Sequence, residues 1–387
     1  MKKKSLLLFI IVLAQFFCTS LWFAGNGVLN DLIRVFHLDQ NSLASLTSSV
    51  QFGFIIGTLV FAIFNIADRF SPSKVFFGSA VLASICNLGI VISSNTITSL
   101  LIFRFLIGFF LAGIYPVGMK IAADHFDKQL GKSLGFLVGA LVLGTALPHL
   151  LAGFSTSFPW KSVIYSTSSL AFLGGVAILL FVPDGPYRKK SSRLQLKAIF
   201  EIFKNIKFRT AAFGYFGHMW ELYTFWAFVP VILGFYLDAN PTPNFNVSFL
   251  SFSVIAIGSL GCILGGYLSS RYPTKQIAMI ALSISGVCCL ISPFLYELHP
   301  AIFLTLIIVW GFTVIMDSPL FSTLVAKSAP VEIKGSALTI VNCLGYSLTI
   351  LSIQTIFFLN NYYSFEYLLS ILAIGPILGL IALRKNK

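Results

Sequence analysis

Twelve successive apolar runs, each about twenty residues or longer, restrict the fold of this chain more than any other feature of its sequence. They span residues 5–29, 44–67, 75–95, 99–122, 133–153, 161–182, 209–237, 247–269, 276–296, 301–326, 336–359 and 365–383. Lipid offers no water to satisfy backbone amides, so spanning segments must be helices or barrel strands, and barrel strands alternate in polarity. These runs do not alternate. The sequence therefore predicts an all-α integral membrane protein with twelve transmembrane helices.

The composition supports lipid as the surrounding solvent. Hydrophobic residues make up 57% of the chain and charged residues 10%, whereas soluble domains carry about 25% charged residues. The net charge of +13 would suggest nucleic acid in a soluble protein. Here the basic residues lie in short loops between apolar runs, so we expect a lipid bilayer and no nucleic acid as partner. The six cysteines lie inside apolar runs without zinc spacing, so we expect no metal site.

The basic residues also predict the orientation. With the N-terminus in the cytoplasm, all Lys and Arg fall on the cytoplasmic side except Arg34, Lys161 and the intramembrane Arg104. Such asymmetry in short loops sets topology, so we expect a cytoplasmic (inner) membrane protein with both termini in the cytoplasm. The N-terminal segment could be a secretion signal, but its apolar run continues through Trp22 without a cleavage site. We interpret it as the first spanning helix.

The longest polar stretch separates the sixth and seventh runs. Pro183 and Pro186 end the sixth helix. Residues 194–208 space apolar side chains among lysines, which fits either an amphipathic helix on the membrane surface or a flexible basic linker. This predicts an N-terminal bundle (1–182), a cytoplasmic linker (183–208) and a C-terminal bundle (209–387).

The two halves share features at a nearly constant offset. Arg69 recurs as Arg271 after 202 residues, and Gly108 recurs as Gly311 after 203. A duplicated six-helix unit is a recurring plan of transporters, with substrate held between the halves. The offset therefore predicts two pseudo-symmetric six-helix bundles.

Three segments resemble the major facilitator superfamily of secondary transporters. IADRFSPSK, after the second run, looks like the signature between its helices 2 and 3 and contains Asp68, Arg69 and Lys74. RFLIG is similar to the arginine motif of its helix 4, and KGSALTIVNCLGYSLTI looks like the start of its helix 11. The resemblance implies alternating access, with helices 1, 4, 7 and 10 around a central cavity.

The resemblance also implies that the signature loop latches one face closed. Asp68 can accept hydrogen bonds at a helix N-terminus or pair with a basic residue. Arg69, Lys74 and Arg271 can bind helix C-termini or lipid phosphate. The alternative is that these charges only set topology.

Ionisable residues within the membrane are costly and are functional candidates by default. Glu221 is the first choice for proton coupling, with His218 as its partner because residues three apart share a helix face. Asp317, two residues before Pro319, could line a bend in helix 10. A static Glu221–His218 pair and a helix cap by Asp317 are the structural alternatives.

Other candidates could line the cavity. The resemblance implies a proton-relay role for Arg104 in some antiporters; it could also bind an anion or form a structural pair. His149 could line the cavity or bond a backbone carbonyl. The remaining polar and aromatic candidates are Gln15, Trp22, Trp220, Tyr223 and Trp226.

Together these features predict a monomeric secondary active transporter that moves a small organic solute, coupled to protons and without a cofactor. No nucleotide-binding loop is present, so ATP is not expected to drive it directly. A transporter-like sensor or assembly factor is the alternative. A membrane-embedded enzyme would need a nucleophile or metal set beyond His218 and Glu221, so we do not expect an enzyme.

Overall fold

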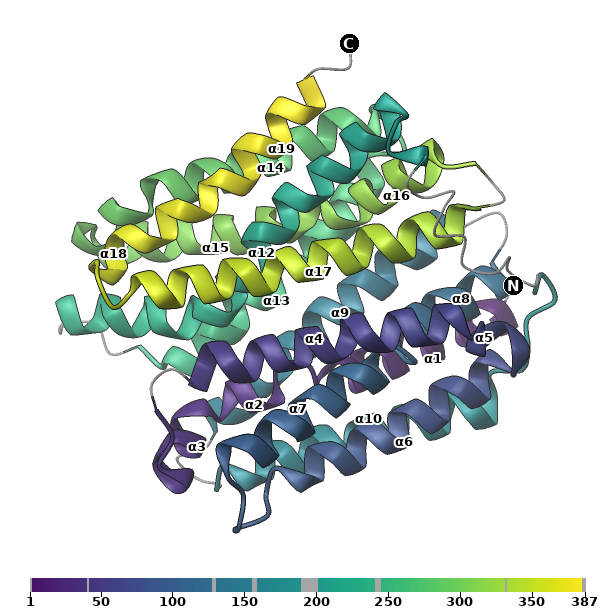
Figure 1. Ribbon diagram of the computed structural model, residues 1–387, viewed down its shortest axis with the longest axis horizontal. Coiled ribbons are helices and arrows are strands. Elements are labelled where there is room, and N and C mark those ends of the chain that lie inside the picture. The colour runs from purple at the N-terminus through teal and green to yellow at the C-terminus, as the bar shows by residue number, and fades with distance from the viewer. Residues whose placement is uncertain are drawn as a thin grey trace. The chain divides into compact units, whose positions relative to one another are not determined.

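The computed structural model describes residues 2–39, 42–126, 130–154, 159–188, 201–240, 245–330 and 333–384 (Figure 1). These residues form helices and turns and no strand, so the all-α prediction is confirmed for this part of the chain. Ten of the described helical segments are long and apolar enough to cross a membrane. The other two predicted spans correspond to α1 (Lys2–Thr19) and α6 (Pro72–Gly89), so the count of twelve stays a prediction.

The chain forms two compact units, Met1–Arg193 and Leu194–Lys387. Residues 189–200 of the predicted linker at 183–208 lie outside the described residues, and with them the first part of its proposed amphipathic helix at 194–208. The seventh helix begins at Ile206, where the Asn205 side chain accepts hydrogen bonds from the amides of Lys207 and Phe208. This N-cap starts the helix three residues before the predicted apolar run.

In the N-terminal unit, α4 packs against α7, α6 against α10, and α1 against both α9 and α10 (Figure 1). The other elements of this unit are α2 (Ala24–Gly27), α3 (Leu29–Phe36), α4 (Ser42–Ile63), α5 (Ile66–Arg69), α7 (Ile97–Leu111), α8 (Tyr115–His125), α9 (Leu130–Gly153) and α10 (Lys161–Phe181).

In the C-terminal unit, α12 packs against α17 and α19, and α13 packs against α15 (Figure 1). The elements are α12 (Ile206–Ala239), α13 (Val247–Leu268), α14 (Thr274–Ile291), η1 (Ser292–Glu297), α15 (Pro300–Met316), α16 (Ser318–Ser328), α17 (Lys334–Leu359), α18 (Phe365–Leu368), η3 (Leu369–Ala373) and α19 (Ile374–Arg384).

The repeated glycines lie at matching helix contacts in the two units. A methyl group on Gly108 of α7 would overlap the Val50 carbonyl oxygen of α4. A methyl group on Gly311 of α15 would overlap the Val254 carbonyl oxygen of α13. Small residues allow such close approach between membrane helices. The sequence repeat thus coincides with a repeated packing contact.

Several of the predicted runs are interrupted helices rather than continuous ones, and three of these breaks lie well inside their runs. Residues 20–23 separate α1 from α2, residues 112–114 separate α7 from α8, and Asp317 separates α15 from α16. The second and third breaks precede Pro116 and Pro319, which lack an amide hydrogen and collide with the preceding turn. Each break exposes backbone carbonyls that side chains must satisfy.

Candidate functional site

Glu221 is buried near the middle of α12 and is fully hydrogen-bonded. Its Oε1 accepts a hydrogen bond from Trp310 Nε1 at 2.6 Å, and its Oε2 accepts one from Ser285 Oγ at 3.0 Å. The Cys289 thiol is a third hydrogen-bond partner of this carboxylate. These partners come from α14 and α15, and Glu221 is only 1% exposed. The donors satisfy both carboxylate oxygens, as a buried acid requires.

His218 lies one helical turn before Glu221, but its partner is Asp317. The distance from His218 Nδ1 to Asp317 Oδ1 is 2.7 Å, and neither residue is exposed. Trp310 and Ser285 hold the Glu221 carboxylate toward α14 and α15, and the break before α16 places Asp317 beside α12. The expected His218–Glu221 pairing is therefore replaced by a contact between α12 and the helix break.

The His218–Asp317 pair retains unused hydrogen-bonding capacity. Among the residues that the structure describes, His218 Nε2 and Asp317 Oδ2 have no hydrogen-bond partner. The rings of Tyr215 and Phe321 flank the imidazole, with centroids 5.9 Å and 6.2 Å from it. The pair is thus a buried polar contact with aromatic neighbours, and two of its polar atoms have no hydrogen-bond partner among the described residues.

Arg104 is buried on α7. Its guanidinium donates hydrogen bonds to groups at the break between α1 and α2. Its Nη1 donates to the Leu21 carbonyl at 3.2 Å, and its Nη2 donates to the Trp22 carbonyl at 2.6 Å. Nη2 also donates to Asn26 Oδ1 at 3.2 Å. These contacts favour the structural role among the alternatives for Arg104, because they satisfy carbonyls that the interrupted helix leaves open.

The other predicted cavity residues of the N-terminal unit, Gln15, Trp22 and His149, are also buried. Neither side-chain amide atom of Gln15 has a hydrogen-bond partner in the described part of the chain, and the same holds for His149 Nε2. The Phe23 ring lies 6.5 Å from the His149 ring, and the Trp22 ring lies 4.8 Å from that of Phe54. Gln15 and His149 thus resemble His218 in having open polar atoms.

The aromatic candidates on α12 divide into two groups. Tyr223 and Trp226 lie together, with ring centroids 5.3 Å apart, and the Tyr223 hydroxyl is 2.8 Å from that of Tyr346. Trp220 is half-buried, and its Nε1 donates to the Ile371 carbonyl of η3 at 3.4 Å. Helical spacing alone did not predict that Trp220 points toward η3 while Tyr223 and Trp226 lie together near Tyr346.

The signature loop is held by two basic residues that the sequence analysis did not single out. Lys120 Nζ on α8 lies 2.9 Å from Asp68 Oδ1. Arg188 donates to the carbonyls of Asp68 at 3.0 Å and Phe70 at 2.7 Å, and it pairs with Asp184 at 2.7 Å. Asp184 and Arg188 lie four residues apart after the sixth run, and this spacing could have predicted their ion pair. The loop therefore contacts both α8 and the segment after α10.

The other three predicted loop residues are exposed. They are Arg69, Lys74 and Arg271. The Arg271 guanidinium lies 4.7 Å from the Tyr267 ring centroid. These positions fit either a lipid contact or a role in topology alone.

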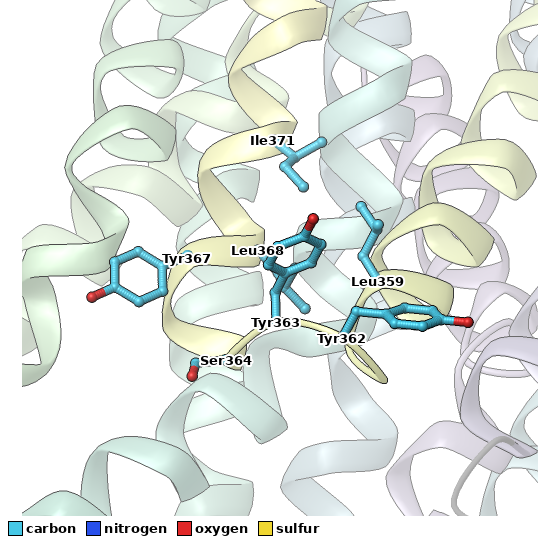
Figure 2. A pocket seen from close by; sticks show the side chains of 7 residues that line it. All are labelled: Leu359, Tyr362, Tyr363, Ser364, Tyr367, Leu368 and Ile371. Atoms are coloured by element: carbon cyan, nitrogen blue, oxygen red, sulfur yellow. The ribbon is translucent and has the colours of Figure 1, made fainter.

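A surface hollow of about 430 Å³ in the C-terminal unit contains none of the predicted residues. Figure 2 shows its lining, which is Leu359, Tyr362, Tyr363, Ser364, Tyr367, Leu368 and Ile371. Apart from Ser364 this lining is aromatic and aliphatic, and it carries no charged group. The hollow therefore does not include the buried ionisable residues, and its lining differs from them in carrying no charge.

Comparisons with known proteins point to transport. Over 193 residues the chain is 27% identical to the efflux pump FUB11 of Gibberella moniliformis, covering 48% of this chain and 32% of that pump. Over 304 residues it is 24% identical to the benzoate transport protein of Acinetobacter baylyi, covering 66% and 62%. Over 186 residues it is 25% identical to the putative niacin/nicotinamide transporter NiaP of Bacillus subtilis, covering 46% and 45%. The chain thus spans a third to three fifths of these relatives' lengths.

The family assignment rests on a longer match. Residues 9–353 match the profile of the Major Facilitator Superfamily. The described helices include ten candidate membrane spans. The chain is therefore a multi-pass membrane protein that belongs to the major facilitator superfamily of transporters.

Proposed function

We propose that this protein is a proton-coupled secondary active transporter that moves a small organic solute across the cytoplasmic membrane. It works as a monomer by alternating access, with both termini in the cytoplasm. The observation that carries the coupling proposal is the buried contact between His218 and Asp317 in the C-terminal unit. Acid and histidine chains inside membrane proteins commonly serve proton relays.

The relatives support a solute class. Benzoate and niacin, which appear in the names of two relatives, are both single-ring aromatic carboxylic acids, and the second name also includes nicotinamide, the amide of niacin. We therefore propose a small aromatic monocarboxylate as the solute. Movement of such an anion together with one proton is electroneutral, so a site that binds a proton reversibly suits this cargo.

Transport by purified protein in proteoliposomes tests the proposal. At about pH 7.5 nearly all of a carboxylic acid is ionised, so little of the neutral acid leaks passively across the bilayer. Protein-free liposomes measure the leak that remains. We expect counterflow of labelled benzoate or nicotinate that requires the protein. An inside-alkaline gradient should stimulate initial uptake, and a protonophore should remove the stimulation.

The two parts of the proposal can fail separately. Absence of protein-dependent counterflow with every aromatic carboxylate tested would contradict the solute class. Counterflow with no response of net uptake to the pH gradient would contradict proton coupling.

A further inference from the structure

The two buried acids of the C-terminal unit differ in how completely they are hydrogen-bonded. Trp310, Ser285 and Cys289 occupy both oxygens of Glu221. Asp317 Oδ1 lies 2.7 Å from His218 Nδ1, and Asp317 Oδ2 has no hydrogen-bond partner among the described residues. A buried polar atom without a hydrogen-bond partner destabilises the folded state. Such an atom in a native protein therefore calls for an explanation, and a functional role is one.

The helix break shows that the His218 contact competes with a local alternative. Asp317 occupies the N-cap position of α16, where an aspartate side chain normally accepts hydrogen bonds from the first amides of the helix. Here the side chain makes no cap hydrogen bond. Its carboxylate instead lies 2.7 Å from His218 Nδ1. The fold thus holds Asp317 against histidine and leaves a helix end uncapped.

We propose that the His218–Asp317 pair is the proton-binding site of this transporter, and that Glu221 is a positioning residue that holds α12 against α14 and α15. This inference rests on the proposed function. Asp317 fixes His218 through Nδ1, so Nε2 is the atom that gains and loses the proton. With the proton bound, the imidazolium and the carboxylate form a neutral pair. Release of the proton leaves neutral imidazole beside the carboxylate, and no other bond changes.

The groups around the pair leave this role to His218. Glu221 and Tyr215 face it from α12, and Cys262 on α13 lies within electrostatic range of Asp317. On α16 the neighbour is the ring of Phe321. Of these groups, Glu221 is the one other carboxylic acid, and neutral donors already hydrogen-bond to its oxygens. An imidazole is also the side chain whose charge changes most readily near neutral pH.

The test compares Asp317→Asn and His218→Gln with Glu221→Gln in proteoliposomes. A gradient of one pH unit supplies about 1.4 kcal/mol per proton, which is about tenfold in accumulation. We expect the gradient to stimulate benzoate uptake by wild type and by Glu221→Gln, with the latter slower. In Asp317→Asn and His218→Gln the stimulation should disappear while counterflow continues. Loss of stimulation in Glu221→Gln with retention in both pair variants would overturn the inference.

A second measurement needs no substrate. The thermal unfolding midpoint of purified protein between about pH 5 and pH 9 reports protons that bind differently to folded and unfolded chains. We expect Asp317→Asn and His218→Gln to flatten this profile relative to wild type and Glu221→Gln. Profiles that keep the wild-type shape in both pair variants would overturn the inference. If wild type transports no aromatic carboxylate, the proposed function fails and this profile still decides the proton site.

Discussion

Replacing Arg104 by alanine should destabilise the N-terminal unit rather than weaken solute binding. Arg104 donates three hydrogen bonds, at 3.2, 2.6 and 3.2 Å, to groups in or beside the break between α1 and α2. Hydrogen bonds to charged groups contribute about 1.5–3 kcal/mol in soluble proteins, and interhelical bonds in membranes average about 0.6 kcal/mol. With about 1 kcal/mol for each bond, the loss is about 3 kcal/mol.

The assay is thermal unfolding in detergent together with transport kinetics. For a unit of nearly 200 residues, 1 kcal/mol shifts the midpoint by about 2–4 °C, so Arg104→Ala should lower it by about 6–12 °C. Arg104→Lys should lower the midpoint by roughly half as much, because an ammonium can reach one carbonyl but not all three groups. Arg69→Ala is the matched control, since it removes the same charge from an exposed position in the same unit.

The kinetic result separates the two roles of Arg104. A structural cap predicts that properly folded Arg104→Lys protein keeps a KM near the wild-type value. The structural reasoning would be refuted if Arg104→Ala melted with wild-type stability and raised the KM for the carboxylate by about tenfold, which corresponds to 1.4 kcal/mol of lost binding.

Two further outcomes follow from helix packing and from the Glu221 contacts. Gly108→Ala should lower the free energy of unfolding by about 1–3 kcal/mol, because the added methyl group overlaps the Val50 carbonyl oxygen. In Gly78→Ala the methyl group meets nothing within 4 Å, so this variant should stabilise its helix by about 0.5–1 kcal/mol. Equal thermal midpoints for the two variants would contradict the packing argument. Trp310→Phe should lose about 2 kcal/mol by removing the 2.6 Å donor to Glu221. Its cost should shrink in the Glu221→Gln background, and additivity in that double-mutant cycle would show that the bond contributes little.

The sequence by itself determined the membrane class and the position of most helices, because apolar runs of spanning length are a local property of the chain. It also identified Glu221, His218, Asp317 and Arg104 as the residues to examine, because an ionisable group inside an apolar run is conspicuous without any structure. The repeated glycines Gly108 and Gly311 were visible as a constant offset, and their shared packing role follows from the duplicated helix pair.

The tertiary structure decided which partner each of these groups has. His218 and Glu221 share a helix face by spacing, but the rotation of α12 against α14 and α15 directs Glu221 to Trp310 and Ser285. The break between α15 and α16 brings Asp317 to His218 across 99 residues of chain. Partner choice depends on helix rotation and on where helices break, and both are set by packing between segments distant in sequence. For that reason the apolar runs revealed the ionisable residues, but helical spacing did not predict how they pair.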